Sequence, residues 1–263
     1  MENPLQGKVA IVTGAGRGIG RGLAIAYARA GAQVVVSSRT RSTVEEVTEV
    51  IRAAGGEALG VACDVGHREQ IHALIEQTIK TYGAVHILVN NAQGFGTPAN
   101  PTPAPMPRAF EDTDDEEWEF TFRTGATATL WSMKAAFPYM KAQGYGRVIN
   151  LSSGAGQIGA AGLGAYVATK EAIRGMTRVA AREWARYGIT VNAISPLIET
   201  RTMQDTKRDR PELYEGVIET VPMRRLGTVD GDLAPVAIFL AGEGSGYVTG
   251  QTFNVDGGGY IAP

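Results

Sequence analysis

Cysteine and histidine are scarce in this sequence, which has one cysteine, Cys63, and three histidines among 263 residues. One cysteine cannot form an intrachain disulfide, and the histidines lack metal-ligand spacing, so we expect neither a disulfide scaffold nor a bound metal. No stretch approaches the roughly 18 apolar residues of a membrane span, and the N-terminus carries an acid without an apolar targeting segment. These absences predict a cytoplasmic protein without a membrane anchor.

Excess charge of either sign is also missing, since 25 Lys and Arg face 27 Asp and Glu. Nucleic-acid binders usually show a basic excess, so we expect no nucleic-acid partner. Hydrophobic residues make up 44% of the chain and charged residues 20%, which is typical of a folded globular protein. Glycine is abundant, at 34 residues. That number indicates places where the backbone approaches a neighbour closely.

Short apolar runs alternate with helical patterns along the whole chain. The runs are nearly continuous in apolar residues, as in strands buried on both faces of a parallel sheet. Between them, apolar residues recur three and four apart, which predicts amphipathic crossover helices. We therefore expect an α/β protein: a single-domain, Rossmann-like, doubly wound parallel sheet with helices on both faces, over residues 1–263. The predicted strands are residues 9–12, 33–36, 58–62, 85–89, 147–151, 190–194 and 251–255.

Two segments interrupt this alternation. Residues 93–113 contain five prolines and follow a predicted strand directly. They form either a surface insertion or a wall of the substrate pocket at the carboxyl edge of the sheet. Residues 197–225 form an amphipathic excursion that we interpret as a substrate lid. In the second interpretation Gln93, Phe95 and Leu197 line the pocket.

A glycine-rich turn lies between the first predicted strand and the first predicted helix. It reads T-G-x-x-x-G-x-G, with Gly14, Gly18 and Gly20. The common G-x-G-x-x-G fingerprint fails, because Ile19 and Arg21 stand where its third glycine would be. Glycines at this place let the backbone approach a pyrophosphate at a helix N-terminus. A turn without a ligand is the alternative.

The turn and the motifs that follow it resemble the short-chain dehydrogenase/reductase family, in its single-domain branch, from Lys8 to Gly259. Each motif alone is weak, but all of them occur in order and at family spacing. The matching residues are Thr13 to Gly20, Asp64-Val65, Asn90-Asn91-Ala92, Ser153, Tyr166-x-x-x-Lys170, Asn192 with Pro196, and Val255 to Gly258.

Tyr166 and Lys170 are four residues apart on a predicted helix, hence neighbours on one face, and Ser153 lies 13 residues before Tyr166. An ammonium about 4 to 5 Å from a phenol favours the phenolate, so we expect Lys170 to lower the pKa of Tyr166 toward neutrality. The resemblance implies that Tyr166 exchanges the substrate proton, that Lys170 also holds the nicotinamide ribose, and that Ser153 hydrogen-bonds the substrate carbonyl. An ordinary surface pair on a helix is the alternative.

Cofactor choice is predicted from the end of the second strand, Ser37-Ser38-Arg39, which contains no acid. An acid there binds the ribose hydroxyls of NAD, whereas an arginine accommodates the 2′-phosphate of NADP. Arg17 in the glycine turn adds a second cation, and solvated surface arginines are the alternative. We therefore expect NADP(H). The expected cofactor contacts are Gly14, Arg17, Gly18, Ile19, Gly20, Ser38, Arg39, Asp64, Val65, Asn90, Ala92, Tyr166, Lys170, Pro196, Ile198 and Thr200.

Three positions depart from the family pattern. Gln93 replaces the glycine that ends the N-N-A-G motif, and Pro196 runs into Leu197 without the usual glycine. Gly125 stands where relatives have an asparagine that helps hold a water between the active-site lysine and solvent. We hypothesise that this proton relay is either rebuilt by a directly held water or not rate-limiting.

The sequence thus predicts an NADP(H)-dependent oxidoreductase that transfers a hydride between the nicotinamide and a carbonyl or secondary alcohol. Cellular NADPH favours the direction of a carbonyl reductase. The alternative, prompted by Gly125, is a catalytically weak NADP-binding scaffold or regulatory protein. The family resemblance also implies a homotetramer acting on a small-molecule substrate.

Overall fold

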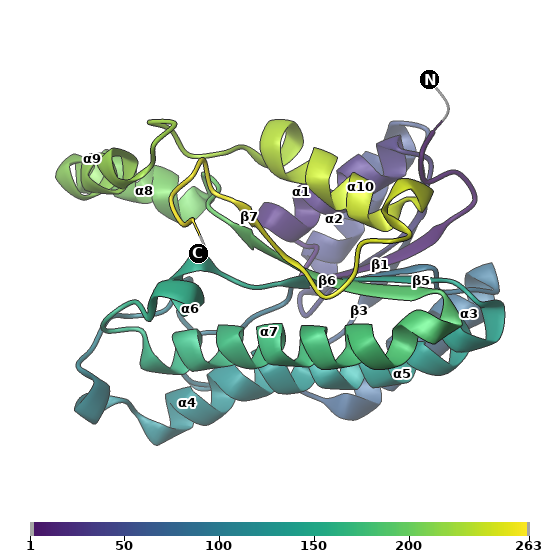
Figure 1. Cartoon of the computed structure of the whole chain (residues 1–263), viewed down its shortest axis with the longest axis horizontal. Coiled ribbons are helices and arrows are strands. Elements are labelled where there is room, and N and C mark those ends of the chain that lie inside the picture. Colours follow the sequence, from purple (N-terminus) through teal and green to yellow (C-terminus); the bar gives the residue numbers. More distant parts are fainter. Residues whose placement is uncertain (1–2, 262–263) are drawn as a thin grey trace.

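The computed structural model describes residues 3–261, in which seven strands form one parallel sheet of order β3-β2-β1-β4-β5-β6-β7. Figure 1 shows helices packed on both sides of this sheet. The expected Rossmann-like fold is confirmed, and every predicted strand agrees with the structure to within two residues at each end. The strands are β1 (Val9–Thr13), β2 (Gln33–Ser38), β3 (Glu57–Ala62), β4 (Ile87–Asn90), β5 (Gly146–Leu151), β6 (Ile189–Pro196) and β7 (Thr252–Val255).

The two faces of the sheet are covered by different helices (Figure 1). One face carries α1 (Gly18–Arg29), α2 (Arg41–Ala53) and α10 (Ala234–Ala241). The other carries α3 (Arg68–Tyr82), α4 (Asp115–Phe122), α5 (Ala128–Gln143) and α7 (Gly164–Trp184). The shorter elements are α6 (Gly154–Ile158), α8 (Arg201–Asp209), α9 (Pro211–Thr220), the 3-10 turns η1 (Phe110–Asp112), η3 (Ala185–Tyr187) and η5 (Glu243–Ser245), and the π-helical turns η2 (Arg123–Thr127) and η4 (Val229–Leu233).

The hydrophobic core consists of two layers, one on each side of the sheet. Successive residues of a strand point to opposite faces. Accordingly, Val34 and Val36 of β2 join the core under α1 and α10, whereas Val35 joins the core under α3 and α5. Both faces are buried, which explains why the strands are continuous in apolar residues.

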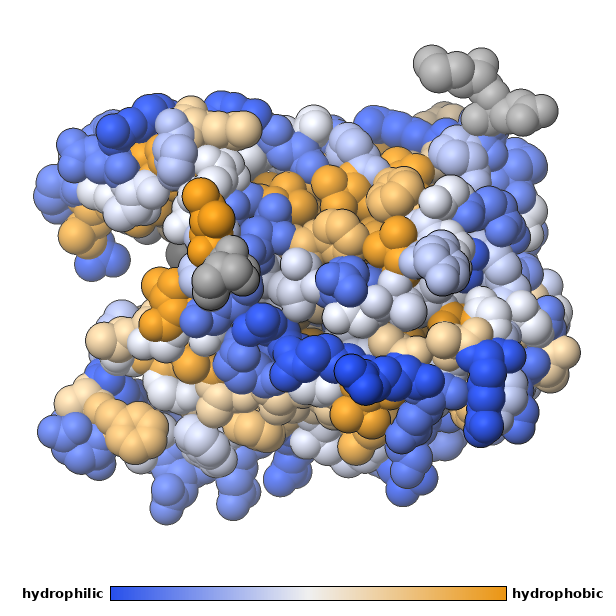
Figure 2. Space-filling view, viewed as in Figure 1, coloured by the Kyte–Doolittle hydropathy of each residue, from blue (hydrophilic) through white to orange (hydrophobic). Residues whose placement is uncertain are grey.

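The ligand-binding edge follows from the strand order. β1 pairs with both β2 and β4, so the direction of the crossover connections reverses at β1. In open α/β sheets, ligands bind outside the carboxyl ends of the strands at such a switch point. Figure 2 shows a hollow at this edge, between the projection formed by α8 and α9 and the part that contains α4.

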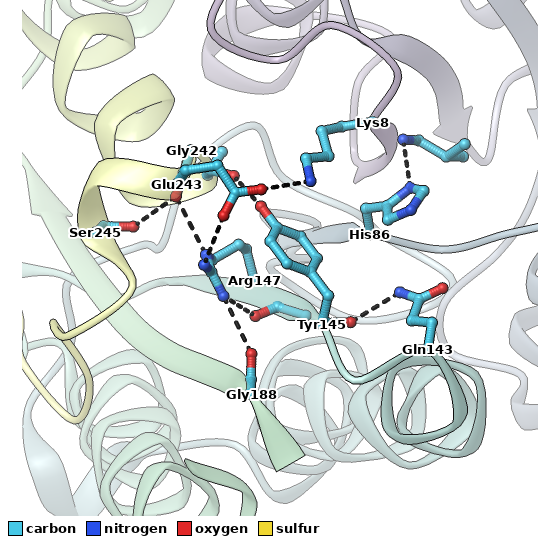
Figure 3. Close-up of polar contacts among 12 residues, drawn as sticks. Lys8, His86, Gln143, Tyr145, Arg147, Gly188, Gly242, Glu243 and Ser245 are labelled. Carbon is cyan, nitrogen blue, oxygen red and sulfur yellow. Dashed lines mark hydrogen bonds and ion pairs between the residues drawn. The ribbon is translucent and has the colours of Figure 1, made fainter. Parts of the chain in front are cut away.

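The opposite, amino edge is closed by a polar cluster (Figure 3). The Tyr145 ring lies between the Lys8 ammonium, 3.8 Å from its centroid, and the Arg147 guanidinium, 4.2 Å away. Lys8 also pairs with Glu243 at 2.6 Å, and buried Arg147 donates to the Gly242 carbonyl at 3.2 Å. These contacts join β1, β5 and the end of α10, so this edge is structural.

Residues 3–261, the part of the chain that the structure describes, contain no membrane-spanning helix, no cluster of metal ligands and no activated thiol. No helix there is both long and apolar enough to cross a membrane, and no three His, Cys, Asp or Glu side chains gather as metal ligands do. Burial raises the pKa of the Cys63 thiol to about 11, so this side chain stays a protonated core residue near neutral pH.

Candidate active site

The glycine turn after β1 packs tightly against the start of the segment that follows β4. Gly14 and Gly18 have φ angles of +67° and +55°, which glycine adopts at little cost. A Cβ added at Gly14 would lie 2.8 Å from Asn91 Nδ2, and one added at Gly20 would lie 2.5 Å from the same atom. Around Gly18, by contrast, the described residues leave open space. The turn therefore needs glycine to close and presents bare backbone at Gly18.

Thr13 and Asn91 hold this turn in place, a role that the sequence did not reveal. Asn91 Nδ2 donates to the carbonyls of Thr13 and Gly14 at 2.9 and 3.3 Å, and the Asn91 amide donates to Thr13 Oγ1 at 3.0 Å. The Asn90 side chain instead donates to Asn150 Oδ1 inside the sheet, at 2.8 Å. Ala92 lies beside the turn, where its amide also donates to Thr13 Oγ1 at 3.2 Å, and the contact of Asn90 and Ala92 with the cofactor stays a prediction.

The N-terminus of α1 is suited to an anion. Arg17 is its N-cap, and in the described chain no side chain caps this end and no acid lies in its first turn. The first backbone N–H groups of the helix, at Gly18, Ile19 and Gly20, are therefore available, and the helix dipole favours a negative charge there.

Two unpaired arginines flank the place where the turn meets β2. A Cβ at Gly16 would lie 2.7 Å from Ser38 Oγ, so the backbone at Gly16 packs closely against this side chain. Arg17 and Arg39 follow them and are exposed, and neither pairs with a carboxylate anywhere in residues 3–261. Arg21 in the next turn of the helix does pair, with Glu46 at 3.6 Å. Two free cations and a hydroxyl are thus offered where the 2′-phosphate of NADP would be recognised.

Asp64 and Val65 follow β3 as expected for the adenine side. Asp64 Oδ1 accepts from the Gly66 amide at 2.9 Å, so this carboxylate holds its own turn. Val65 is buried and packs in the core layer beneath α3. Their contact with adenine stays a prediction.

Ser153, Tyr166 and Lys170 meet beyond the end of β5. Ser153 is the N-cap of α6, with Oγ accepting from the Ala155 amide at 3.2 Å, and its side chain also hydrogen-bonds the Tyr166 phenol. Lys170 lies one turn after Tyr166 in α7, with Nζ 5.5 Å from the centroid of the Tyr166 ring. Lys170 Nζ donates to the Leu151 carbonyl at 2.9 Å.

The expected effect of Lys170 on Tyr166 is wrong for this structure. Burial raises the pKa of Tyr166, and the hydrogen bond with Ser153 only partly opposes this. The Lys170 ammonium is directed at the Leu151 carbonyl and not at the phenol, and burial lowers the pKa of Lys170 to about 8. The Tyr166 phenol is thus protonated near neutral pH, and Lys170 has a pKa of about 8, well below that of an exposed lysine.

The proline-rich segment reaches this site through several contacts. Phe95 packs edge-to-face on Tyr166, with ring centroids 5.7 Å apart. Arg108 pairs with buried Glu117 of α4 at 2.9 Å, and its amide donates to the Gly162 carbonyl at 3.0 Å, just before α7. These contacts give residues 93–113 a defined path beside Tyr166.

The second irregular segment is a pair of helices, α8 and α9, outside the end of β6. Its first residues are fixed by the sheet, because the Leu197 amide donates to the Val255 carbonyl at 2.9 Å and Ile198 is buried. Thr200 Oγ1 caps α8 by accepting from the Met203 amide at 3.4 Å. Pro196, the last residue of β6, thus leads into a backbone anchored at the edge of the hollow.

One contact at the site was not foreseen from the sequence. The Gln93 carboxamide lies against Gly125, so two departures from the family pattern occupy the same place. Gln93 and Gly125 could each be recognised in the sequence as a departure from the family pattern. That the two residues are in contact could not be predicted from the sequence, because they are far apart along the chain.

Comparison with known proteins supports this geometry. A family model described as enoyl-(acyl carrier protein) reductase matches residues 14–259. The chain is 35% identical to a 12alpha-hydroxysteroid dehydrogenase from a Clostridium species, with 96% of each chain covered. It is 36% identical to a 3-oxoacyl-(acyl-carrier-protein) reductase from Staphylococcus aureus, covering 97% of this chain and 98% of that one.

Solved structures agree. A provisionally assigned gluconate dehydrogenase from Agrobacterium tumefaciens superposes with a TM-score of 0.90 at 31% identity, over 100% of both chains. A provisionally assigned NAD(P)-dependent gluconate 5-dehydrogenase from Beutenbergia cavernae superposes with a TM-score of 0.88 at 33% identity, over 98% of both chains. That structure contains NADP at low occupancy.

Proposed function

Because this chain belongs to the short-chain dehydrogenase/reductase family, oxidoreductases that act on CH–OH and C=O groups, we propose that it is an NADP(H)-dependent carbonyl reductase. The observation that carries the proposal is the meeting of Ser153, Tyr166 and Lys170 at the carboxyl edge of the sheet. They lie on the same edge as the glycine turn and its uncapped helix end.

NADP is proposed over NAD because Arg17 and Arg39 have no acidic partner among residues 3–261 and the end of β2 carries no acid. Charge-assisted hydrogen bonds contribute about 1.5 to 3 kcal/mol each. One or two such bonds to a 2′-phosphate give a preference of about tenfold to ten-thousandfold. The NADP bound to the Beutenbergia cavernae relative supports the same choice.

The glycine turn and the uncapped end of α1 fit the pyrophosphate of this cofactor, with Gly14, Gly18, Ile19 and Gly20 supplying the close backbone surface. The reduced nicotinamide, when bound, supplies the hydride for the carbonyl carbon. We assign the nicotinamide end to Lys170 and to Pro196, Ile198 and Thr200 at and beyond the end of β6. We assign the adenosine half to Asp64, Val65, Asn90 and Ala92.

The proton comes from Tyr166 in this scheme. Ser153 Oγ accepts from the Ala155 amide, and its O–H, which meets the Tyr166 phenol in this structure, turns to donate to a substrate carbonyl oxygen. Tyr166 donates a second hydrogen bond to that oxygen and gives up its proton as the oxygen gains charge. Burial keeps the phenol protonated beforehand, since the pKa of Tyr166 is raised. Lys170, with its pKa lowered to about 8, then returns a proton to the phenolate.

We place the substrate between the two irregular segments. Phe95 provides an aromatic surface directly on Tyr166. The Arg108–Glu117 ion pair and the hydrogen bond from the Arg108 amide to the Gly162 carbonyl hold residues 93–113 in position. Leu197 begins the opposite side, which continues into α8 and α9. Gln93 lies at the base of this wall, where it contacts α4.

The test of cofactor choice is Arg39→Asp. We expect the Kd of NADPH to rise by about tenfold or more, because an attraction to the 2′-phosphate becomes a repulsion, while the Kd of NADH stays the same or falls. The matched control is Arg41→Asp, since Arg41 is equally exposed but lies in α2 beside Glu45. Equal Kd values for NADPH and NADH in the unmodified protein would refute NADP preference.

The reductase itself is tested by NADPH consumption with a panel of ketones, quinones and aldehydes. Turnover with any of them supports the enzyme. The scaffold alternative, prompted by Gly125, predicts tight NADPH binding and no turnover with the whole panel.

We also propose that the chain assembles as a homotetramer, as its family resemblance implies. Apolar side chains are exposed on three helices, at Leu130 of α5, Val179 of α7 and Phe239 of α10. Figure 2 shows apolar atoms gathered over α10. Burying such faces against a second copy is favourable. Light scattering that gives the mass of one chain at micromolar concentration would refute this assembly.

A further inference from the structure

Two positions that depart from the family pattern, Gln93 and Gly125, occupy one space beside the active site. A Cβ added at Gly125 would lie 2.5 Å from Gln93 Oε1 and 2.8 Å from Gln93 Nε2, and would also meet Thr169 Cγ2. Real Cβ atoms do not approach other atoms this closely. The Gln93 carboxamide therefore fills the volume that any side chain at 125 would use.

The orientation of this carboxamide is fixed by its donor end. Gln93 Nε2 donates to the Thr121 carbonyl at 3.0 Å and to the Gly94 carbonyl at 3.3 Å. Exchanging the oxygen and nitrogen would direct the amide oxygen at two carbonyl oxygens, so the network itself selects this orientation. As a result Gln93 Oε1 faces Gly125, where it is buried and has no hydrogen-bond partner among residues 3–261.

A second unsatisfied atom belongs to Thr169, the residue whose methyl group borders this space. Thr169 Oγ1 is buried and accepts or donates no hydrogen bond within the described chain, and Thr169 Cγ2 faces Gly125 from α7. Thr169 directly precedes Lys170. Buried polar atoms nearly always have a partner, protein or water, and a buried water needs two to four polar groups. Gln93 Oε1 and Thr169 Oγ1 are two such groups from different elements.

The backbone at this place is unusual. Gly125 is the middle residue of the π-helical turn η2, and such turns are frequent at functional sites. Gln93 bonds the carbonyl of Thr121, at the end of α4 just before this turn. The glutamine thus supports the turn as well as filling the space beside it.

We propose that Gln93 takes over the place of the side chain missing at Gly125 and, with Thr169, holds a water that passes protons to Lys170. Gln93 is a positioning residue in this scheme, because it acts on the proton path through the water. The proposal rests on the proposed reductase function for its kinetic part. The spatial exchange between positions 93 and 125 does not depend on activity.

The spatial part is tested by a swap. Gly125→Asn alone must displace the buried amide, and Gln93→Gly alone leaves a void, so we expect each to lower the thermal unfolding temperature. The double variant Gln93→Gly with Gly125→Asn restores one amide to one space, so we expect its unfolding temperature to exceed the additive value clearly. Additive losses would overturn the shared space, and this holds whether or not the protein proves to be a reductase.

The proposed role in the proton relay is tested by Gln93→Met, which keeps the length of the side chain and removes its carboxamide, both the C=O and the NH2 group. We expect kcat for NADPH-dependent reduction to fall by about tenfold or more and the pH profile of kcat to shift, because reprotonation through Lys170 becomes limiting. The double swap should return kcat to within a few-fold of the original protein. The control is Gln143→Met, since Gln143 also donates to two backbone carbonyls, of Val85 and Tyr145 at 2.7 and 2.8 Å, far from the site.

The possible results distinguish three claims: that Gln93 and Gly125 share one space, that Gln93 acts in the proton relay, and that the protein is a reductase. A pH profile that shifts in Gln93→Met but not in Gln143→Met supports the relay role. An unchanged profile in Gln93→Met, with the swap still non-additive in stability, overturns the relay and leaves Gln93 as packing. An unmodified protein that turns over no carbonyl substrate contradicts the proposed function, while the stability cycle still decides whether the two positions share a space.

Discussion

Lys170→Met should change how the stability of the protein depends on pH while removing its activity. Burial lowers the pKa of Lys170 from its ordinary 10.5 to about 8, so the folded protein holds a charge that its surroundings disfavour. Each pKa unit corresponds to about 1.4 kcal/mol, which gives a cost of about 3 kcal/mol near pH 7. The variant also loses the 2.9 Å bond to the Leu151 carbonyl, worth about 1.5 to 3 kcal/mol for a charged donor.

The net change at one pH is therefore small, and the decisive quantity is its pH dependence. Between about pH 8 and 10.5 the unfolded chain still binds the proton that folded Lys170 has released, so the original protein gains stability as pH rises. A methionine at 170 does not titrate, so the variant lacks this gain in stability with pH. The stability of the variant relative to the original should thus fall by about 2 kcal/mol between about pH 7 and 9.5.

The assay is chemical unfolding of both proteins, without cofactor, at several pH values. Lys134→Met is the control, because Lys134 is exposed on α5, away from the site, and its removal should leave the pH dependence unchanged. If the free energy of unfolding changes with pH in the same way for the original protein and for Lys170→Met, the claim that burial disfavours the charge of Lys170 is refuted. Retained turnover in Lys170→Met would refute its place in the proton path.

Other perturbations test separate parts of the structure. Tyr166→Phe should abolish turnover and leave the Kd of NADPH within a few-fold, because one hydroxyl is removed; unchanged kcat would contradict its role as the proton donor. Replacing residues 97–108 with a short Gly-Ser turn should change KM and substrate selectivity but not NADPH binding, and unchanged kinetics would make the segment a surface insertion. His86 accepts from the Val9 amide at 2.9 Å and burial lowers its pKa below 6.5, so stability falls as pH drops below about 6.5. His86→Gln should reduce that fall relative to the exposed control His72→Gln; equal pH slopes would contradict it.

The strands were predictable because their pattern comes from one physical cause. Residues such as Val34, Val35 and Val36 must all be apolar when both faces of a parallel sheet are covered, and the chain shows this run directly. The motif residues were predictable for a related reason. Each one sits at the end of a strand or on one helix face, so its neighbours follow from the order of the elements.

What could not be predicted depends on packing between distant segments. The pKa direction of Tyr166 follows from its enclosure and from where the Lys170 ammonium points, toward Leu151. Neither the enclosure of Tyr166 nor the direction of the Lys170 ammonium can be predicted from the spacing of residues in the sequence. The contact of Gln93 with Gly125 likewise appears only when the chain after β4 folds against η2.

That contact also constrains the order in which this protein could have acquired its present sequence. A glutamine at 93 collides with any side chain at 125, whereas a glycine at 125 with glycine at 93 leaves only a void. An overlap this close forces the backbone or the amide to move, whereas a polar void can take up water. Losing the side chain at 125 before gaining the glutamine is therefore the less obstructed order of substitution. The same asymmetry blocks return, because restoring a side chain at 125 in one substitution must first expel the amide now buried there.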